Sequence, residues 1–178
     1  MLRGKGGDQI FAVIVENKPG VLFRVTNMIR RRGFNIESIS VGTLIDPSYS
    51  RMTIVIRGDE REVNQVMKNL YKLVETIKVA KIPSDRSVLR ELALIKVKAP
   101  NADVRADILN YTQIFRARVV DVASESLTIE ITGEPEKIDA FINVIKEFGV
   151  KEIARTGIAA LVRGSRTIHD ENDLGVRQ

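Results

Sequence analysis

The feature that most constrains the fold of this chain is an internal repeat. Met52–Gly58 (Met-Thr-Ile-Val-Ile-Arg-Gly) matches Leu127–Gly133 (Leu-Thr-Ile-Glu-Ile-Thr-Gly) at a constant offset (133 − 58 = 75). The apolar positions that follow at helical spacing keep the same offset: Val63 with Ile138, Val66 with Phe141, Met67 with Ile142 and Leu70 with Ile145. A strand, a turn and an amphipathic helix therefore occur twice, and two copies of one small domain are expected.

The first copy has the pattern of a βαββαβ domain. Short β-branched runs indicate strands, and apolar residues at every third or fourth position indicate helices. Pro19 is expected at the first helical position, with Asn17 or Lys18 at the cap, and Val74 is expected to face inward from the second helix. The predicted elements are strands at 10–15, 35–41, 51–56 and 77–82 and helices at 19–32 and 59–74.

The second copy repeats this order. Its predicted elements are strands at 91–98, 119–123, 127–133 and 151–155 and helices at 103–115 and around 138–145, with 158–162 extending the last strand. The expected fold class is thus α+β, with two tandem ferredoxin-like domains at residues 8–83 and 84–164. The polar tail, residues 165–178, is expected to be disordered.

Composition narrows the functional classes. No apolar stretch approaches the length that a membrane span requires, and the N-terminus lacks the apolar run of a secretion signal. The chain has no cysteine, so disulfides, thiolate nucleophiles and cysteine zinc sites are excluded. A cytoplasmic protein is expected.

Residues for catalysis are scarce. The single histidine, His169, lies in the polar tail, and no motif pairs a nucleophile with a base. Acidic residues such as Glu60 and Glu75 fall on helix surfaces, where solvation explains them. We expect neither catalytic nor metal-binding residues in this chain.

The positive net charge of +5 raises nucleic acid as a partner. However, basic and acidic residues are interspersed, and Arg30–Arg32 falls in the last turn of a predicted helix, where the helix dipole favours cations. The two central strands of the first domain offer only Phe11 for base stacking. No nucleic-acid partner is expected.

The loop at Asn17–Gly20 can bind a small zwitterion. It places backbone N–H groups at a helix N-terminus, where an anion is favoured, and Gly20 permits close approach of a ligand. An asparagine amide both donates and accepts, so Asn17 suits either end of an amino acid. Read alone, the same residues also describe an ordinary turn with a helix cap.

Longer motifs separate these two interpretations. The run 17–25 (Asn-Lys-Pro-Gly-Val-Leu-Phe-Arg-Val) resembles the signature of the ACT domain, a small-molecule sensor of βαββαβ fold. The run 32–38 (Arg-Gly-Phe-Asn-Ile-Glu-Ser), followed by 50–54, resembles the small regulatory subunit of acetolactate synthase. Further similar runs at 69–74, 90–97, 114–117 and 154–157 extend the resemblance from about Ile10 to about Gly164.

This resemblance implies a non-catalytic subunit of branched-chain amino-acid biosynthesis. Its large catalytic partner carries thiamine diphosphate, Mg and FAD and condenses pyruvate, while the small subunit binds no cofactor, raises activity and confers feedback inhibition, usually by valine. The valine-site positions of the family correspond to Asn17, Gly20 and Asn35, and on physical grounds we add Val21, Leu22 and Ile36 as an apolar slot. The alternatives are an ACT-type sensor for a different enzyme or regulator, and an enzyme of ferredoxin-like fold.

The predicted topology adds a constraint on this site. Asn17 and Asn35 flank one helix and are separated by roughly 20 Å at a rise of about 1.5 Å per residue. In a sheet of strand order 4-1-3-2, the second strand lies at an edge that invites pairing. We therefore expect a two-fold homodimer with two sites, each formed by both chains.

Overall fold

The computed structural model describes residues 7–170. The chain divides into two compact units. The first comprises residues up to Val88 together with those from Ile158 onward, and the second comprises Leu89–Gly157. The sequence pattern predicts a second domain at 84–164 and does not indicate that the chain returns to the first unit.

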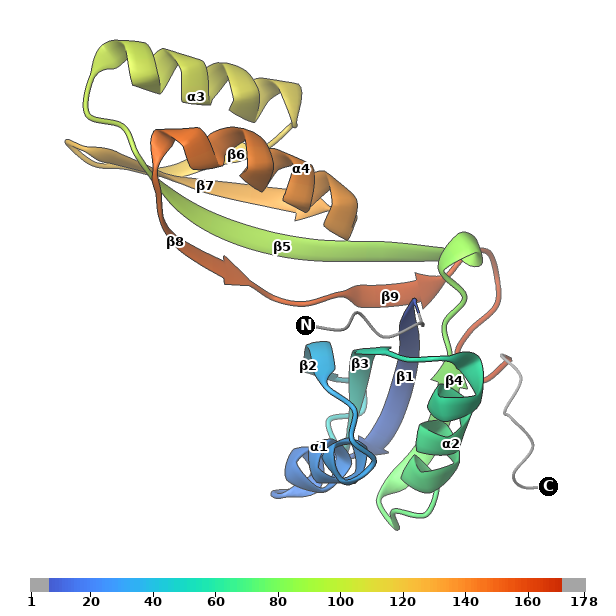
Figure 1. The fold of residues 1–178 in the computed structure, drawn as a ribbon. Helices are drawn as coiled ribbons and strands as arrows, with labels where there is room; N and C mark the ends of the chain where they lie inside the picture. Colours follow the sequence, from blue (N-terminus) through green and yellow to red (C-terminus); the bar gives the residue numbers. More distant parts are fainter. Residues whose placement is uncertain (1–6, 171–178) are drawn as a thin grey trace. The chain divides into compact units, whose positions relative to one another are not determined.

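The first unit is a four-stranded antiparallel sheet of order β2-β3-β1-β4 with two helices on one face (Figure 1). This order confirms the prediction that the second strand lies at an edge. The elements are β1 (Asp8–Glu16), α1 (Val21–Arg31), β2 (Ile36–Thr43), β3 (Tyr49–Arg57), α2 (Glu60–Leu70) and β4 (Thr76–Lys81).

The core of this unit lies between the sheet and the helices. Apolar residues at helical spacing place Val21, Val25 and Ile29 of α1 inward. Asp59 begins α2 with a capping box: its side chain accepts from the Glu62 N–H, and the Glu62 carboxylate accepts from the Asp59 N–H.

The helix α2 is shorter than the periodicity suggested. It ends at Leu70, and the chain turns before β4 begins at Thr76. The prediction that Val74 faces inward is wrong, because that side chain lies in the turn and is 92% exposed.

The second face of this sheet is covered by the returning chain. Ile10, Ala12 and Ile14 of β1 point away from the helices and are nevertheless buried. The guanidinium of Arg51, which pairs with Ile14 across the strands, donates to the Ala160 carbonyl at 2.6 Å. The buried side chains of the returning segment are Ile158, Ala160 and Ile168.

Two sequence expectations concern this returning segment. Residues 159–162 form a separate strand, β9 (Ala159–Val162), and do not extend β8, which ends at Arg155. In the tail, residues 165–170 form turns, with Asp170 accepting from the Thr167 N–H, and Ile168 is buried. The rest of the expected disordered tail, 171–178, lies outside the described residues.

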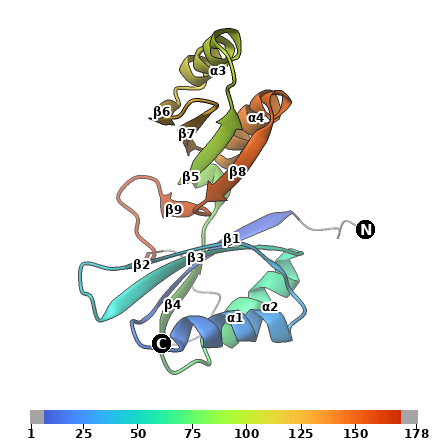
Figure 2. The same cartoon turned by 90° about the vertical axis from the view of Figure 1, so that its left-hand side faces the viewer.

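The second unit repeats the arrangement, as the internal repeat predicted. Figure 2 shows its two helices on one face of its own sheet, whose order β6-β7-β5-β8 corresponds to that of the first. The elements are β5 (Ser87–Lys98), α3 (Ala102–Ile114), β6 (Arg118–Val122), β7 (Ser126–Gly133), α4 (Pro135–Ile145) and β8 (Val150–Arg155), with short 3-10 turns at Ser84–Arg86 and Lys146–Phe148. The α+β fold of two βαββαβ units is confirmed.

Candidate functional site

Gly20 leaves the N-terminus of α1 without a side-chain cap. It occupies the N-cap with a positive φ of 83°, a conformation that favours glycine, and no side chain caps the helix. A Cβ at this position would lie 3.3 Å from Nη1 of Arg24. The expectation that Asn17 or Lys18 caps the helix is wrong, since the helix begins at Val21 and its first-turn amides receive no side-chain oxygen.

Asn17 instead holds two loops together. Its Nδ2 donates to the Pro47 carbonyl at 2.9 Å, and its backbone N–H donates to the Ser48 carbonyl at 2.7 Å. The loop between β2 and β3 is thus attached beside the N-terminus of α1. The carbonyl oxygen and second N–H of the amide are the groups with which Asn17 can meet a ligand.

The charges around this loop are balanced. Lys18 contacts Glu16 at 2.7 Å, and Arg24 contacts Glu75 at 2.8 Å. The hydrogen bond to Glu16 is the main reason that the pKa of Lys18 is raised. A ligand carboxylate at the helix N-terminus would therefore meet acidic groups that already have a cationic partner.

The apolar residues proposed from the sequence fall into different environments. Val21 is only 3% exposed and belongs to the core, so its side chain does not line a surface slot. Leu22 is 45% exposed and presents its side chain to solvent at the start of α1. Ile36 is half-buried at the start of β2.

Asn35 and Ile36 line a surface hollow of about 560 Å³ along one flank of α1. The other lining residues are Phe23, Thr26, Asn27, Arg30 and Phe34. Sequence reasoning missed the four from α1, although their spacing at positions 23, 26, 27 and 30 is that of one helix face. That spacing could have indicated a second, polar face on this helix.

The structure does not bring the two asparagines together within one chain. Asn17 and Gly20 precede α1, and Asn35 and Ile36 follow it. The 11 residues of α1 span roughly 16 Å at a rise of about 1.5 Å per residue. The candidate residues therefore form two groups at opposite ends of one helix.

Within residues 7–170, the edge strand β2 pairs on one side only, with β3. Val41 on this strand and Leu44 and Ile45 directly after it are exposed apolar side chains. Exposed apolar residues at an open edge are a surface onto which another strand can pair.

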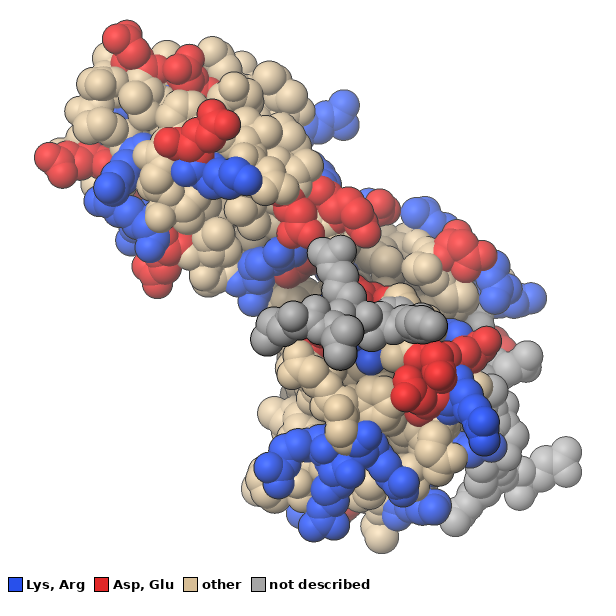
Figure 3. Space-filling view, viewed as in Figure 1, with Lys and Arg blue, Asp and Glu red and all other residues tan. Residues whose placement is uncertain are grey.

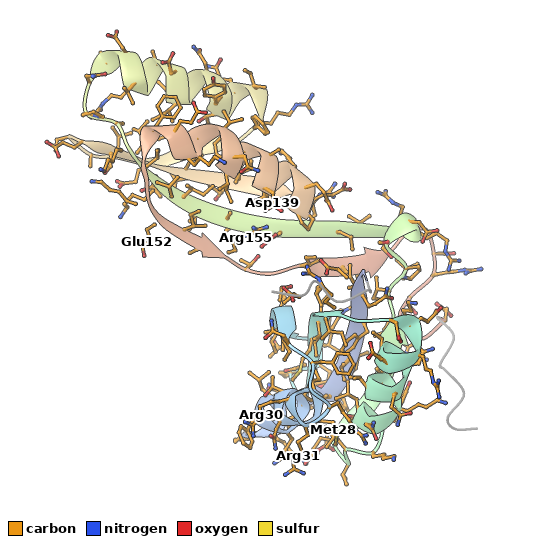
Figure 4. All side chains as sticks on the ribbon, in the orientation of Figure 1. Met28, Arg30, Arg31, Asp139, Glu152 and Arg155 are labelled. Carbon is orange, nitrogen blue, oxygen red and sulfur yellow. The ribbon has the colours of Figure 1, made fainter. Side chains whose placement is uncertain are left out.

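Basic side chains gather on the surface of the first unit around α1 (Figure 3). Figure 4 labels Arg30 and Arg31 at the C-terminal end of this helix. Both are exposed, and both have a structural explanation because cations at this end oppose the helix dipole.

The second unit contains a charged cluster around Arg155, which Figure 4 labels together with Asp139. The Arg155 guanidinium donates through Nε and Nη2 to the two Glu91 oxygens at 2.7 and 2.6 Å, and through Nη1 to Asp139 at 2.7 Å. Hydrogen bonding to Glu91 raises the pKa of Arg155. This cluster joins β8, β5 and α4 and has the geometry of a structural ion pair.

Two further features are absent from residues 7–170. No group of three or more His, Asp or Glu side chains within that range is arranged to hold a metal ion. None of the helices described there is both long and apolar enough to cross a membrane.

Comparison with known families divides the chain in the same way as its repeat. Residues 11–78 match the family described as the AHAS small subunit-like ACT domain, and residues 90–164 match the small subunit of acetolactate synthase. The βαββαβ fold, the open N-terminus of α1 and this match place the first unit among the ACT regulatory domains.

Whole-chain relatives specify the family. The chain is 56% identical to a probable acetolactate synthase small subunit of Archaeoglobus fulgidus, over 87% of this chain and 96% of the relative. It is 49% identical to that of Methanothermobacter thermautotrophicus, over 94% of this chain and 100% of the relative. The crystal structure of the Thermotoga maritima acetolactate synthase small subunit matches with a TM-score of 0.83 at 42% identity, covering 90% of this chain and 99% of that one.

The chain belongs to the acetolactate synthase small-subunit family. It is accordingly a non-catalytic subunit that partners a large catalytic subunit, and its ACT domain indicates a regulatory role. The cofactors of catalysis would belong to the large subunit.

Proposed function

We propose that this chain is a feedback sensor that binds valine between the ACT domains of a homodimer and thereby inhibits the catalytic subunit. In the absence of valine it raises the activity of that subunit. The catalytic subunit carries thiamine diphosphate, Mg and FAD and forms the acetolactate from which branched-chain amino acids are made, in the cytoplasm. The chain itself contributes no catalytic group and binds no cofactor.

The observation that carries this proposal is the position of the two half-sites. Asn17 and Gly20 lie at one end of α1, Asn35 and Ile36 at the other, and β2 leaves an open edge between them. Antiparallel pairing of two β2 edges about a two-fold axis sets the Asn35 end of one chain beside the Asn17 loop of its partner. One dimer then has two equivalent sites.

The chemistry of the half-sites suits an aliphatic amino acid. The uncapped first turn of α1 favours a carboxylate, and the amide of Asn17 can accept from an ammonium group. Leu22 and Ile36 supply apolar surface for a branched side chain. A ligand of this kind would connect the two chains across the interface.

Inhibition follows from linkage. If valine binds one arrangement of the dimer more tightly than another, it shifts the population toward that arrangement. If the catalytic subunit binds the other arrangement more tightly, valine weakens the binding of that subunit, and the subunit weakens the binding of valine by the same factor.

Replacing Gly20 with Asp tests the site. The carboxylate of G20D would occupy the helix N-terminus and repel the ligand carboxylate, so we expect the affinity for valine to fall by about 100-fold or more. The holoenzyme should keep its activity and lose its inhibition. Gly164→Asp is the matched control, because Gly164 has a φ of 79°, close to that of Gly20, and open space around it.

A mixed dimer tests whether the site is shared. Gly20→Asp and Asn35→Ala each damage both sites of a homodimer. When the two variants are combined in one dimer, one site carries both substitutions and the other carries none. Calorimetry should then show one high-affinity valine site per mixed dimer; absence of any recovered site would refute the two-chain arrangement.

A further inference from the structure

The hollow along α1 has a specific chemical character. Phe23, Phe34 and Ile36 form its apolar part, while Asn27, Asn35 and Arg30 provide polar groups. The hydroxyl of Thr26 is already used, since it donates to the Leu22 and Phe23 carbonyls at 3.0 and 3.1 Å. Among the lining residues Arg30 is the charged one, and none is acidic.

Arg30 and its neighbour Arg31 share a charge and a helix turn but differ in their position relative to the hollow. Arg30 and Arg31 are both exposed in the last turn of α1, so the helix dipole affects both. Among the described ion pairs, neither has a carboxylate partner. Arg30 lines the hollow with Asn35 and Ile36, whereas Arg31 does not.

The hollow is open in a single chain, and the proposed dimer would close it. The strand that begins with Ile36 is the open edge β2. Pairing of two such edges would set the partner's α1 N-terminus against this hollow. A carboxylate at that N-terminus would then face Arg30, the charged residue among those that line the hollow.

We propose that Arg30 receives the carboxylate of the amino-acid ligand, with Asn27 beside it and with Phe23 and Ile36 as the wall for the aliphatic side chain. This inference rests on the proposed function and adds the residues that determine ligand class. An arginine–carboxylate hydrogen bond is charge-assisted and strengthens as water is removed. The site accordingly selects small aliphatic molecules that carry a carboxylate.

The test compares valine with valinamide, which keeps the ammonium and the isopropyl group but lacks the carboxylate. Calorimetry on the full-length protein should show valinamide binding more weakly than valine. In Arg30→Gln we expect valine affinity to fall by about tenfold or more, the usual effect of losing a charge-assisted hydrogen bond. Valinamide affinity should change little, so the preference for valine over valinamide should shrink by the same factor.

Arg31→Gln is the matched control, with the same loss of charge in the same helix turn. Unchanged affinities in Arg31→Gln, together with the selective loss in Arg30→Gln, would support the assignment. Equal losses in both variants, or an unchanged valine preference in Arg30→Gln, would overturn it. If Gly20→Asp still abolishes binding in that case, the proposed function stands and the role of Arg30 alone is rejected. If the wild-type protein binds no valine, both proposals fail.

Discussion

Removal of the Arg155 side chain should destabilise the second domain by about 2–3 kcal/mol. In Arg155→Leu the carboxylate of Glu91, which is 6% exposed, loses its bidentate partner and remains buried as an unpaired charge. Breaking a buried pair in this way costs about 3–5 kcal/mol. We use a lower value because Arg155 is 33% exposed, so water can reach part of the pair.

The stability lost in Arg155→Leu should result from the unpaired carboxylate of Glu91 and not from the lost contact with Asp139. Asp139 is 57% exposed, and Asp139→Asn should therefore cost about 0.5 kcal/mol or less. A double variant, Arg155→Leu with Glu91→Leu, removes the unpaired charge and should be more stable than Arg155→Leu alone.

Hydrogen exchange followed by mass spectrometry measures each domain separately. In Arg155→Leu, amides of β5 and β7 should exchange about 30-fold faster or more, as a loss of about 2–3 kcal/mol requires. Amides of β1 and β3 should be unchanged. Equal effects of Arg155→Leu and Asp139→Asn, or no recovery in the double variant, would refute the reasoning that the buried carboxylate sets the cost.

Two further predictions use positions related by the repeat. Asp59→Ala removes the capping box of α2, so the free energy of unfolding measured in urea should fall by about 1 kcal/mol. Glu134 is at the equivalent N-cap but makes no side-chain cap bond, so Glu134→Ala should cost about 0.5 kcal/mol or less. Similar costs of the two substitutions would contradict the capping argument. In Gly58→Ala the new Cβ would lie 2.9 Å from the Phe34 ring, which must move, so we expect a loss of about 1 kcal/mol and weaker valine binding by calorimetry. In Gly133→Ala the new Cβ would lie 2.6 Å from Cδ of Lys137, but this flexible side chain can turn aside, so the variant should be within about 0.5 kcal/mol of wild type. A loss as large as that of Gly58→Ala would exclude the ring as the cause.

Part of the candidate site could be read from the sequence. The motif around Asn17 and Gly20 indicated a ligand-binding loop, and topology placed Asn35 at the far end of the same helix. The structure agrees with this separation, because α1 lies between them. The exposure of each side chain could not be predicted from the motif. Val21 and Leu22 are adjacent, yet Val21 is 3% exposed and Leu22 is 45% exposed.

The hollow and the ion pair depend on tertiary packing. Phe23 and Arg30 were visible as residues of one helix, but only packing of α1 beside the start of β2 makes them neighbours of Asn35. Glu91 and Arg155 are 64 positions apart, and the register of β5 against β8 brings them together. No local pattern reports such a pairing, since it depends on how distant segments align.

Local signals in the sequence were sufficient to predict the two βαββαβ domains and the edge position of the second strand. Hydrophobic periodicity and turn residues are local signals, and the repeat supplied each of them twice. The return of the chain beyond Gly157 to the first sheet, where Ile158, Ala160 and Ile168 are buried, depends instead on long-range packing. The apolar run at 158–162 is visible in the sequence, but the surface that it covers depends on what the rest of the fold leaves exposed.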